Sequence, residues 1–230
     1  MMTDARTATR AGLSFPNESV AYREARDALL AAEADLRRRV EAVAAMRRAL
    51  PPGGPVREDY VFEEGDDARQ VRLSELFGPH DTLVAYSWMF GPNMAEACPS
   101  CSSMLDSLDG DVAPILQNAS LAIIGRSPIQ RLLGFARDRG WRNLRLLSSA
   151  NNSYHPDYFG ETPEGQQRPM MNIFSRKGGA IHHTWGGELA YAARDPGQDP
   201  RHIDLIWPLW GVLDLTPEGR GDFNPRLRYD

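Results

Sequence analysis

The only two cysteines of the chain lie in the stretch Cys98-Pro99-Ser100-Cys101. A C-x-x-C pair is typical either of a redox-active dithiol or of half a metal site. Proline is favoured in the first turn of a helix, so we expect Cys98 to cap a helix with its sulfur facing free backbone N–H groups. Those donors and the positive helix end favour a thiolate. In such motifs a thiol pKa can fall from about 8.5 to about 7 or lower, which predicts a nucleophile near neutral pH.

Composition restricts the classes of function that remain. The chain has 230 residues, of which 42% are hydrophobic and 25% charged, as in an ordinary globular protein. Its net charge of −5 argues against a nucleic-acid partner. No apolar run approaches the roughly 20 residues of a membrane helix, and the first residues lack a secretory signal, so we expect a cytoplasmic protein with no membrane partner. There, neighbouring cysteines favour catalysis or metal binding over a structural disulfide.

The pattern of apolar residues divides the chain into three parts. Residues 1–16 are polar and without periodicity, which predicts a flexible tail. Residues 17–50 carry apolar side chains in steps of three and four, which predicts a long helical arm beginning near Asn17. A Pro- and Gly-rich stretch at 51–55 ends it, and residues 56–222 form the main domain. The arm either packs on its own domain or, because its spacing is close to a heptad, forms a homodimer.

Within the main domain, short apolar runs alternate with helical patterns. A hairpin is expected over 60–73, and strands over 82–88, 120–124 and 144–147. Helices are expected after the cysteines, over 128–139, and over 202–212, where Pro208 should kink or split the helix. Residues 148–168 form a long irregular segment of the kind that is often a functional lid or mobile, and Pro169 leads into a second hairpin over 170–185. This alternation predicts an α/β fold with a parallel sheet.

The order of these elements around the C-x-x-C resembles the thioredoxin fold. More closely, residues 22–222 resemble an uncharacterised bacterial thioredoxin-like family, a domain of unknown function distantly related to alkyl hydroperoxide reductase and thiol-specific antioxidant proteins. The resemblance rests on these stretches: Asp59-Tyr60-Val61-Phe62, Leu73-Ser74-Glu75-Leu76-Phe77, Met89-Phe90-Gly91-Pro92, Cys98-Pro99-Ser100-Cys101-Ser102, Ser127-Pro128, Gly140-Trp141, Ser148-Ser149, His183-Thr184 and residues 213–220.

The resemblance implies a thioredoxin-like domain, in which helices flank a central mixed sheet, and a role for Pro169. That residue matches the cis-proline that faces the cysteines and helps to bind substrates in thioredoxin-like proteins. The chain also departs from its relatives. Ala95 stands where the peroxiredoxin motif Pro-x-x-x-Thr-x-x-Cys has threonine, Pro92 is one residue too close to Cys98, and Ala97 replaces the tryptophan of thioredoxin. These departures put efficient peroxide reduction and general disulfide reductase activity in doubt.

Thiol–disulfide redox chemistry is the first functional hypothesis. Cys98 would attack a small-molecule or protein disulfide, a peroxide or another oxidised sulfur, and Cys101 would resolve the mixed intermediate without any cofactor. Arg126 follows a strand at the edge where α/β proteins place functional loops, so it is a candidate to lower the pKa of Cys98 or to hold an anionic substrate. Trp88 and Tyr86 precede the cysteine loop and are candidates to line the substrate pocket.

Two other classes of function remain open. The sulfurs of Cys98 and Cys101 together with His183 would make a soft ligand set for copper or zinc, and would support metal binding or metal-dependent oxidation. His182 and His183 point to opposite faces of their strand, so only one can approach the cysteines, and His183 is the one that matches the family. The third class is an interaction module that uses the long helix for self-association.

Overall fold

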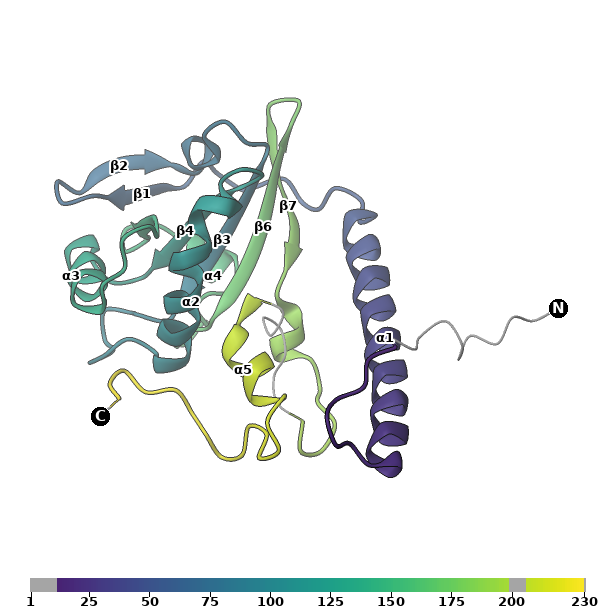
Figure 1. The fold of residues 1–230 in the computed structure, drawn as a ribbon. Coiled ribbons are helices and arrows are strands. Elements are labelled where there is room, and N and C mark those ends of the chain that lie inside the picture. The colour runs from purple at the N-terminus through teal and green to yellow at the C-terminus, as the bar shows by residue number, and fades with distance from the viewer. Residues whose placement is uncertain (1–11, 199–205, 230) are drawn as a thin grey trace. The chain divides into compact units, whose positions relative to one another are not determined.

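The computed structural model describes residues 12–198 and 206–229. In this part of the chain a seven-stranded sheet has the order β2-β1-β5-β4-β3-β6-β7 (Figure 1). Its strands are β1 (Val61–Glu64), β2 (Arg69–Arg72), β3 (Thr82–Trp88), β4 (Ser120–Gly125), β5 (Leu146–Ser148), β6 (Met170–Lys177) and β7 (Ala180–Gly186). The longer helices are α1 (Val20–Arg48), α2 (Pro99–Ile115) and α3 (Ile129–Arg139), and the short ones are η2 (Leu73–Phe77), α4 (Tyr154–Asp157), η3 (Glu188–Tyr191) and α5 (Pro208–Leu213).

The strand pairing confirms the thioredoxin-like fold. Strands β3, β4 and β5 are parallel, whereas β6 pairs antiparallel with β3 and β7 pairs antiparallel with β6. The parallel strands are connected through α2 and α3, and the hairpin β1–β2 adds to the edge beside β5. Both hairpins and the parallel pairing of these strands agree with the sequence-based prediction. Because α2 follows β3, the cysteine pair lies at the carboxyl end of β3.

Side chains of β3 alternate between two apolar layers. Val84, Tyr86 and Trp88 face the layer formed by α2 and α3, which we call the α2 face of the sheet. Leu83 and Ala85 pack in the layer on the opposite side, which we call the far face. The far face is dominated by aromatic side chains, including Tyr60, Phe62, Tyr154 and Phe174. This parity decides which site residues can reach the cysteines.

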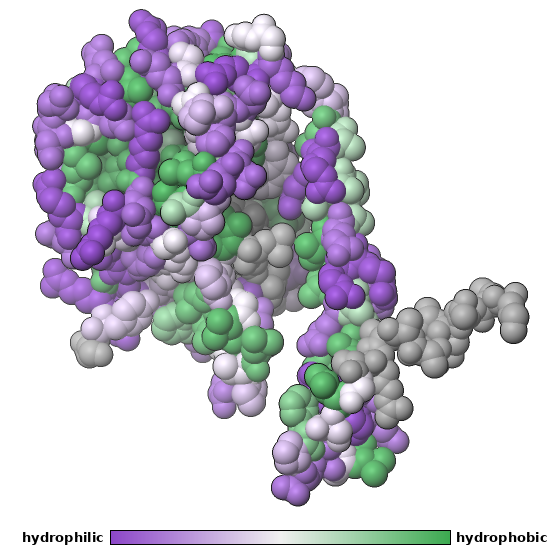
Figure 2. All heavy atoms as spheres, turned by 45° about the horizontal axis from the view of Figure 1, so that its top comes forward, coloured by the Kyte–Doolittle hydropathy of each residue, from purple (hydrophilic) through white to green (hydrophobic). Residues whose placement is uncertain are grey.

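The N-terminal helix α1 belongs to a compact unit of its own, residues 1–51, separate from residues 52–230. It starts later than predicted because Ser19 is the N-cap and its hydroxyl accepts the backbone N–H of Tyr22, whereas Asn17 lies in a turn with φ of 62°. Apolar and charged side chains both occur along it (Figure 2). Residues 1–11 of the expected tail lie outside the described residues, and homodimer formation through residues 17–50 stays a prediction.

The C-terminal helix starts at Pro208, which agrees with the predicted break at this proline. Trp207 before it is an extended N-cap, and Pro208 opens α5 because the missing N–H of proline is tolerated in the first turn. Residues 199–205, including His202, lie outside the described part of the chain. Trp207 and Trp210 pack their rings against each other at 5.2 Å, and both join the apolar layer on the α2 face.

None of the helices within residues 12–198 and 206–229 is both long and apolar enough to cross a membrane.

Candidate active site

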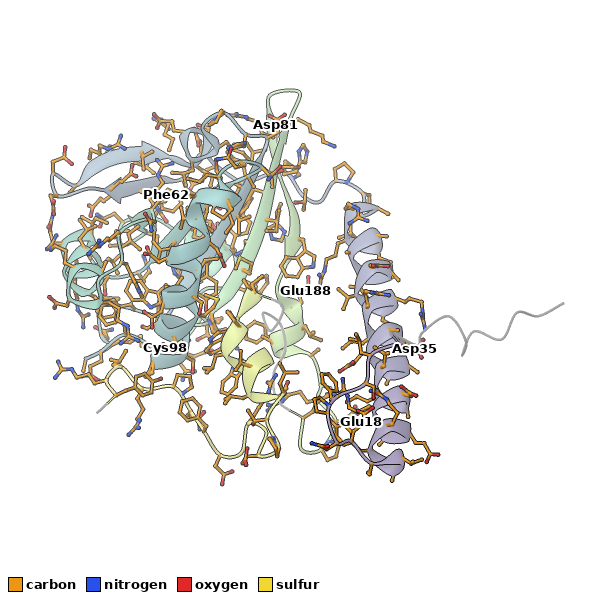
Figure 3. The ribbon with its side chains drawn as sticks, in the orientation of Figure 1. Glu18, Asp35, Phe62, Asp81, Cys98 and Glu188 are labelled. Atoms are coloured by element: carbon orange, nitrogen blue, oxygen red, sulfur yellow. The ribbon has the colours of Figure 1, made fainter. Side chains whose placement is uncertain are left out.

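Cys98 is the N-cap of α2, as its sequence predicts (Figure 3). Its backbone is extended, Pro99 occupies the first turn, and its sulfur accepts the backbone N–H of Cys101 at 3.4 Å. The Cys98 carbonyl accepts two hydrogen bonds from Ser102, from the backbone N–H at 3.0 Å and from the hydroxyl at 2.9 Å. The side chain of Cys98 is partly exposed. The sulfur is therefore held at a helix start and is within reach of solvent.

The electrostatics of this position favour a Cys98 thiolate. A hydrogen bond from the Cys101 thiol has the largest effect, and with the backbone N–H groups of Cys101 and Ser100 it outweighs burial and lowers the pKa of Cys98 to about 6. At neutral pH the sulfur is then mostly ionised. The sequence analysis predicted a lowered pKa for Cys98 from the helix start alone. The structure adds that the partner thiol, one turn further along, is the stronger donor.

Cys101 is buried, with 3% of its surface exposed. Its hydrogen bond to Cys98 and its burial raise the pKa of its thiol, while the Tyr86 hydroxyl and the Met89 backbone lower that pKa. The Tyr86 hydroxyl donates to the Cys101 sulfur at 3.4 Å. Tyr86 is thus a hydrogen-bond partner of the Cys101 thiol. The prediction that it lines a substrate pocket is wrong, because only 1% of its surface is exposed.

Trp88 is also a core residue rather than a pocket residue. It is fully buried, and its ring packs against Phe90, Phe135 and Trp141 at centroid distances of 5.1, 5.3 and 5.3 Å. The prediction that it binds substrate is wrong, because β3 is a central strand and its α2 face is covered by both helices.

The backbone between β3 and Cys98 is held by Arg131 of α3. Its guanidinium donates to the carbonyls of Gly91 at 3.1 Å and Ala95 at 3.0 Å, and also to that of Met94. The same group lies 4.3 Å from the centre of the Phe90 ring. In addition, the Cys98 N–H bonds to the Met89 carbonyl at 3.0 Å. These contacts fix the position from which Cys98 enters α2.

Pro169 is trans, because no peptide bond of the described residues is cis. The cis form implied by the family resemblance is therefore wrong. Pro169 still lies at the edge of the site, since the next residue, Met170, pairs with Ser87 near the end of β3. The Tyr191 hydroxyl donates to the Pro169 carbonyl at 2.6 Å. Burial raises the pKa of Tyr191, the charge of Arg168 over its ring lowers that pKa, and Cys101 raises it by a smaller effect.

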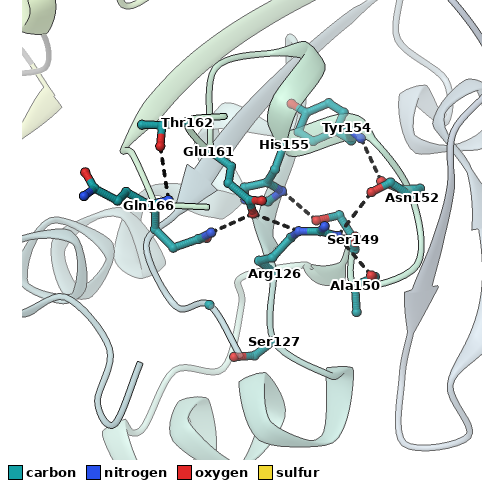
Figure 4. Close-up of polar contacts among 12 residues, drawn as sticks. Arg126, Ser127, Ser149, Ala150, Asn152, Tyr154, His155, Glu161, Thr162 and Gln166 are labelled. Carbon is teal, nitrogen blue, oxygen red and sulfur yellow. Dashed lines mark hydrogen bonds and ion pairs between the residues drawn. The ribbon is translucent and has the colours of Figure 1, made fainter. Parts of the chain in front are cut away.

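Arg126 has a different role from the one predicted (Figure 4). Its Nε pairs with Glu161 at 2.9 Å, and its Nη1 donates to the carbonyls of Ser149, Ala150 and Asn152 at 2.7, 2.9 and 3.2 Å. It is absent from the groups that shift the pKa of Cys98. The prediction that Arg126 acts on the thiol is wrong, because its donors hold the segment 148–168 instead.

A cavity of about 640 Å³ lies on this side of the loop before the cysteines. Arg126 and Glu161 line it together with Met89, Pro92 and Gln167, while neither cysteine does. The segment 148–168 that closes it is ordered by α4 and by a bridge between Glu161 and Gln167. Arg126 therefore faces a neighbouring cavity and not the sulfur of Cys98.

His155 is buried in the same network. Its Nδ1 lies 2.6 Å from the Ser149 hydroxyl, and its side chain has no exposed surface. Burial, with a smaller effect of the Arg126 charge, lowers the pKa of His155 to about 3. The ring stays neutral in the native protein at any pH above that value.

We expect this burial to make stability depend on pH. In the unfolded chain His155 binds a proton below about pH 6.5, whereas in the native protein it does so only below about pH 3. The stabilising contribution of neutral His155 is fully present above about pH 6.5. As the pH falls from about 6 to about 4, this residue alone should lower the free energy of unfolding by about 1.4 kcal/mol per pH unit. NMR titration of the His155 ring checks the cause: it should remain neutral at pH 4.5, and a midpoint near 6.5 would contradict the prediction.

The metal-ligand set proposed from the sequence is not brought together. His183 lies on the far face, where its ring packs against Phe174 at 5.4 Å and its Nε2 bonds to Asn172 at 2.9 Å. Both cysteines lie on the α2 face. Among the residues that the structure describes, no three His, Cys, Asp or Glu side chains form a group that could hold a metal ion. His182 points away from His183, but it pairs with Ser175, at the end of the sheet remote from the cysteines.

Comparison with known families places this chain. Residues 14–228 match a family described as "Bacterial protein of unknown function (DUF899)". The chain belongs to this family. No functionally curated protein matches the sequence. The match covers both the helix α1 and the thioredoxin-like domain, so the DUF899 family includes both parts.

Several solved structures are similar to this DUF899 protein. Thioredoxin peroxidase I of Plasmodium yoelii is 17% identical with a TM-score of 0.44, over 78% of this chain and 99% of its own. Xylella fastidiosa PrxQ is 11% identical with a TM-score of 0.45, over 71% and 97%. A peroxiredoxin-like protein of Aquifex aeolicus is 14% identical with a TM-score of 0.44, over 68% and 84%.

Several site residues of this DUF899 protein were missed by the sequence analysis. Arg131 and Tyr191 each hold backbone beside the cysteines, and His155 fixes the segment before Pro169. Arg131 looked like an ordinary charged residue of a surface helix. Tyr191 lies in a short helix with no apolar periodicity. Their roles arise from tertiary contacts, for which the local sequence carries no signal.

Proposed function

We propose that this protein is a thiol–disulfide oxidoreductase in which Cys98 is the nucleophile and Cys101 the resolving thiol. One observation carries the proposal: the partly exposed sulfur of Cys98 accepts the N–H of Cys101 at a helix start, and its pKa is lowered to about 6. Cys101 is buried beside it and keeps its proton. The Cys98 thiolate can thus attack a substrate disulfide, and the protonated Cys101 thiol lies close enough to resolve the mixed disulfide.

The exchange proceeds in two balanced steps. The Cys98 thiolate attacks one sulfur of a substrate disulfide, the substrate S–S bond breaks, and the first substrate thiolate leaves. Cys101 then loses its proton and attacks Cys98 Sγ, the mixed disulfide breaks, and the second substrate thiolate leaves. The substrate gains two electrons from the two cysteines, and its two thiolates take up one proton released by Cys101 and one from water. The protein is left with a Cys98–Cys101 disulfide.

A disulfide is favoured over a peroxide as the substrate. Alanine stands at position 95 in place of the peroxiredoxin threonine, and the donors of Arg126 are turned to Glu161 and to backbone carbonyls. The hydrogen bonds that lower the pKa of Cys98 come from Cys101 and Ser100. These donors stabilise the attacking sulfur.

The proposal is tested by treating the fully reduced protein with a small aliphatic disulfide at pH 7 and measuring its mass. We expect loss of two hydrogens, a Cys98–Cys101 disulfide in peptide maps, and release of the substrate as thiols. Two outcomes would overturn the proposal: both cysteines remaining as thiols, or a mixed disulfide at Cys98 that Cys101 never displaces.

A further inference from the structure

We infer that the Tyr86 hydroxyl is a catalytic hydrogen-bond donor for the resolving step, in which it stabilises the Cys101 sulfur as that sulfur attacks Cys98. This inference rests on the proposed function. It assigns to a buried tyrosine of β3 a task that the C-x-x-C motif does not itself perform.

Burial makes the resolving step demanding. Cys101 is 3% exposed and belongs to the apolar cluster that also includes Met104, Leu105 and Trp88. A sulfur that loses its proton there is cut off from water, and an unpaired buried charge is costly. The negative charge needs hydrogen-bond donors inside the protein.

The hydrogen bonds around Cys101 change during the cycle. In the reduced protein its thiol donates to the Cys98 thiolate, which holds the proton on Cys101. Once Cys98 is part of a mixed disulfide, its sulfur carries no charge and that restraint is lost. Two donors to Cys101 remain, the Tyr86 hydroxyl at 3.4 Å and the Met89 backbone. Both favour the thiolate at the moment when it must form.

Tyr86 is well suited to stay a donor. Burial and the neighbouring Cys101 raise the pKa of its phenol well above the ordinary value, so the O–H is present at every working pH. Its position is fixed because the side chain is 1% exposed and β3 is hydrogen-bonded on both sides, to β4 and to β6. A fixed donor aimed at developing charge stabilises a transition state without reorganisation.

The step is balanced without any additional reactant. The Cys101 proton leaves on the side of the partly exposed Cys98, where water takes it up. The Cys101 sulfur forms a bond to Cys98 Sγ, and the bond between Cys98 and the substrate sulfur breaks. The Tyr86 proton stays on its oxygen throughout, because the phenol donates a hydrogen bond and does not transfer its proton. The donor becomes weaker as charge moves from Cys101 to the leaving thiolate.

Stopped-flow reaction with 2,2′-dithiodipyridine tests the inference, because the two steps each release one pyridine-2-thione. In the wild-type protein the release of pyridine-2-thione should occur in two phases, the first for attack by Cys98 and the second for attack by Cys101. In Y86F the first phase should keep its rate, and the second should slow on the order of ten- to a hundredfold, as for the loss of a hydrogen bond to a charged group. The pH midpoint of the second phase should move upward in Y86F.

Y154F is the matched control, since Tyr154 is equally buried but lies on the far face, and both of its phases should match the wild type. Y86M, which also lacks the hydroxyl, carries the test if Y86F does not fold. A second phase in Y86F within about twofold of wild type, or equal slowing of both phases, would overturn the inference. A wild-type protein without any second phase would instead overturn the proposed function.

Discussion

Replacing Cys98 with serine should lower the rate of reaction with a model disulfide at pH 7 by at least about a hundredfold. The remaining thiol, that of Cys101, is buried and its pKa is raised. Its thiolate is therefore scarce and shielded from the substrate. The measurement is the second-order rate constant from thiol release. A Cys98→Ser protein that reacts as fast as wild type would contradict the assignment of the nucleophile.

Two replacements of Cys101 separate its roles. Cys101→Ser keeps a donor beside Cys98, so attack should remain fast and the reaction should stop at a stable mixed disulfide. Cys101→Ala removes the donor that lowers the pKa of Cys98 most, so its attack at pH 6 should be slower than that of Cys101→Ser. Equal rates for the two variants at pH 6 would show that the side chain of Cys101 does not stabilise the thiolate.

Gly160→Ala should destabilise the protein by about 2 to 3 kcal/mol, because it overpacks a closed site. An added Cβ would lie 2.6 Å from Cδ2 of His155 and 2.9 Å from Oγ of Ser87, and both of these residues are fully buried. Neither neighbour is the free end of a flexible side chain, so the segment 148–168 must shift. Urea unfolding measures the loss.

Gly134→Ala is the matched control for this change. Gly134 lies inside α3, and an added Cβ there would contact nothing within 4 Å. Alanine is the better helix former, so this variant should gain about 0.5 to 1 kcal/mol. If both glycine variants changed stability in the same direction, the account of the buried site around His155 would be wrong.

The sequence-based predictions were most accurate where local backbone preferences decide the structure. Proline after Cys98 selects the first turn of α2, and that rule depends on local backbone geometry alone. The order of strands and helices followed from apolar runs and turn residues. The N-cap of α1 at Ser19, rather than near Asn17, is an error of a few residues, which arises because several neighbouring residues can cap a helix.

The predictions that failed concern contacts between distant elements. Arg126 was placed at the correct edge of the sheet, but the sequence does not show that Glu161 and three carbonyls would occupy its donors. His183 was expected near the cysteines, yet the register of β6 and β7, with a bulge between Ile173 and Phe174, turns it to the far face. A shift of one residue in register reverses such an assignment. The cytoplasmic location stays a prediction.

The most direct test of the account is the rate of alkylation of Cys98 by iodoacetamide as a function of pH, measured on the reduced wild-type protein by mass spectrometry. The account predicts a single rise with a midpoint at about pH 6, with Cys101 unmodified over the same range. A midpoint near the ordinary thiol value of about 8.5 would contradict it.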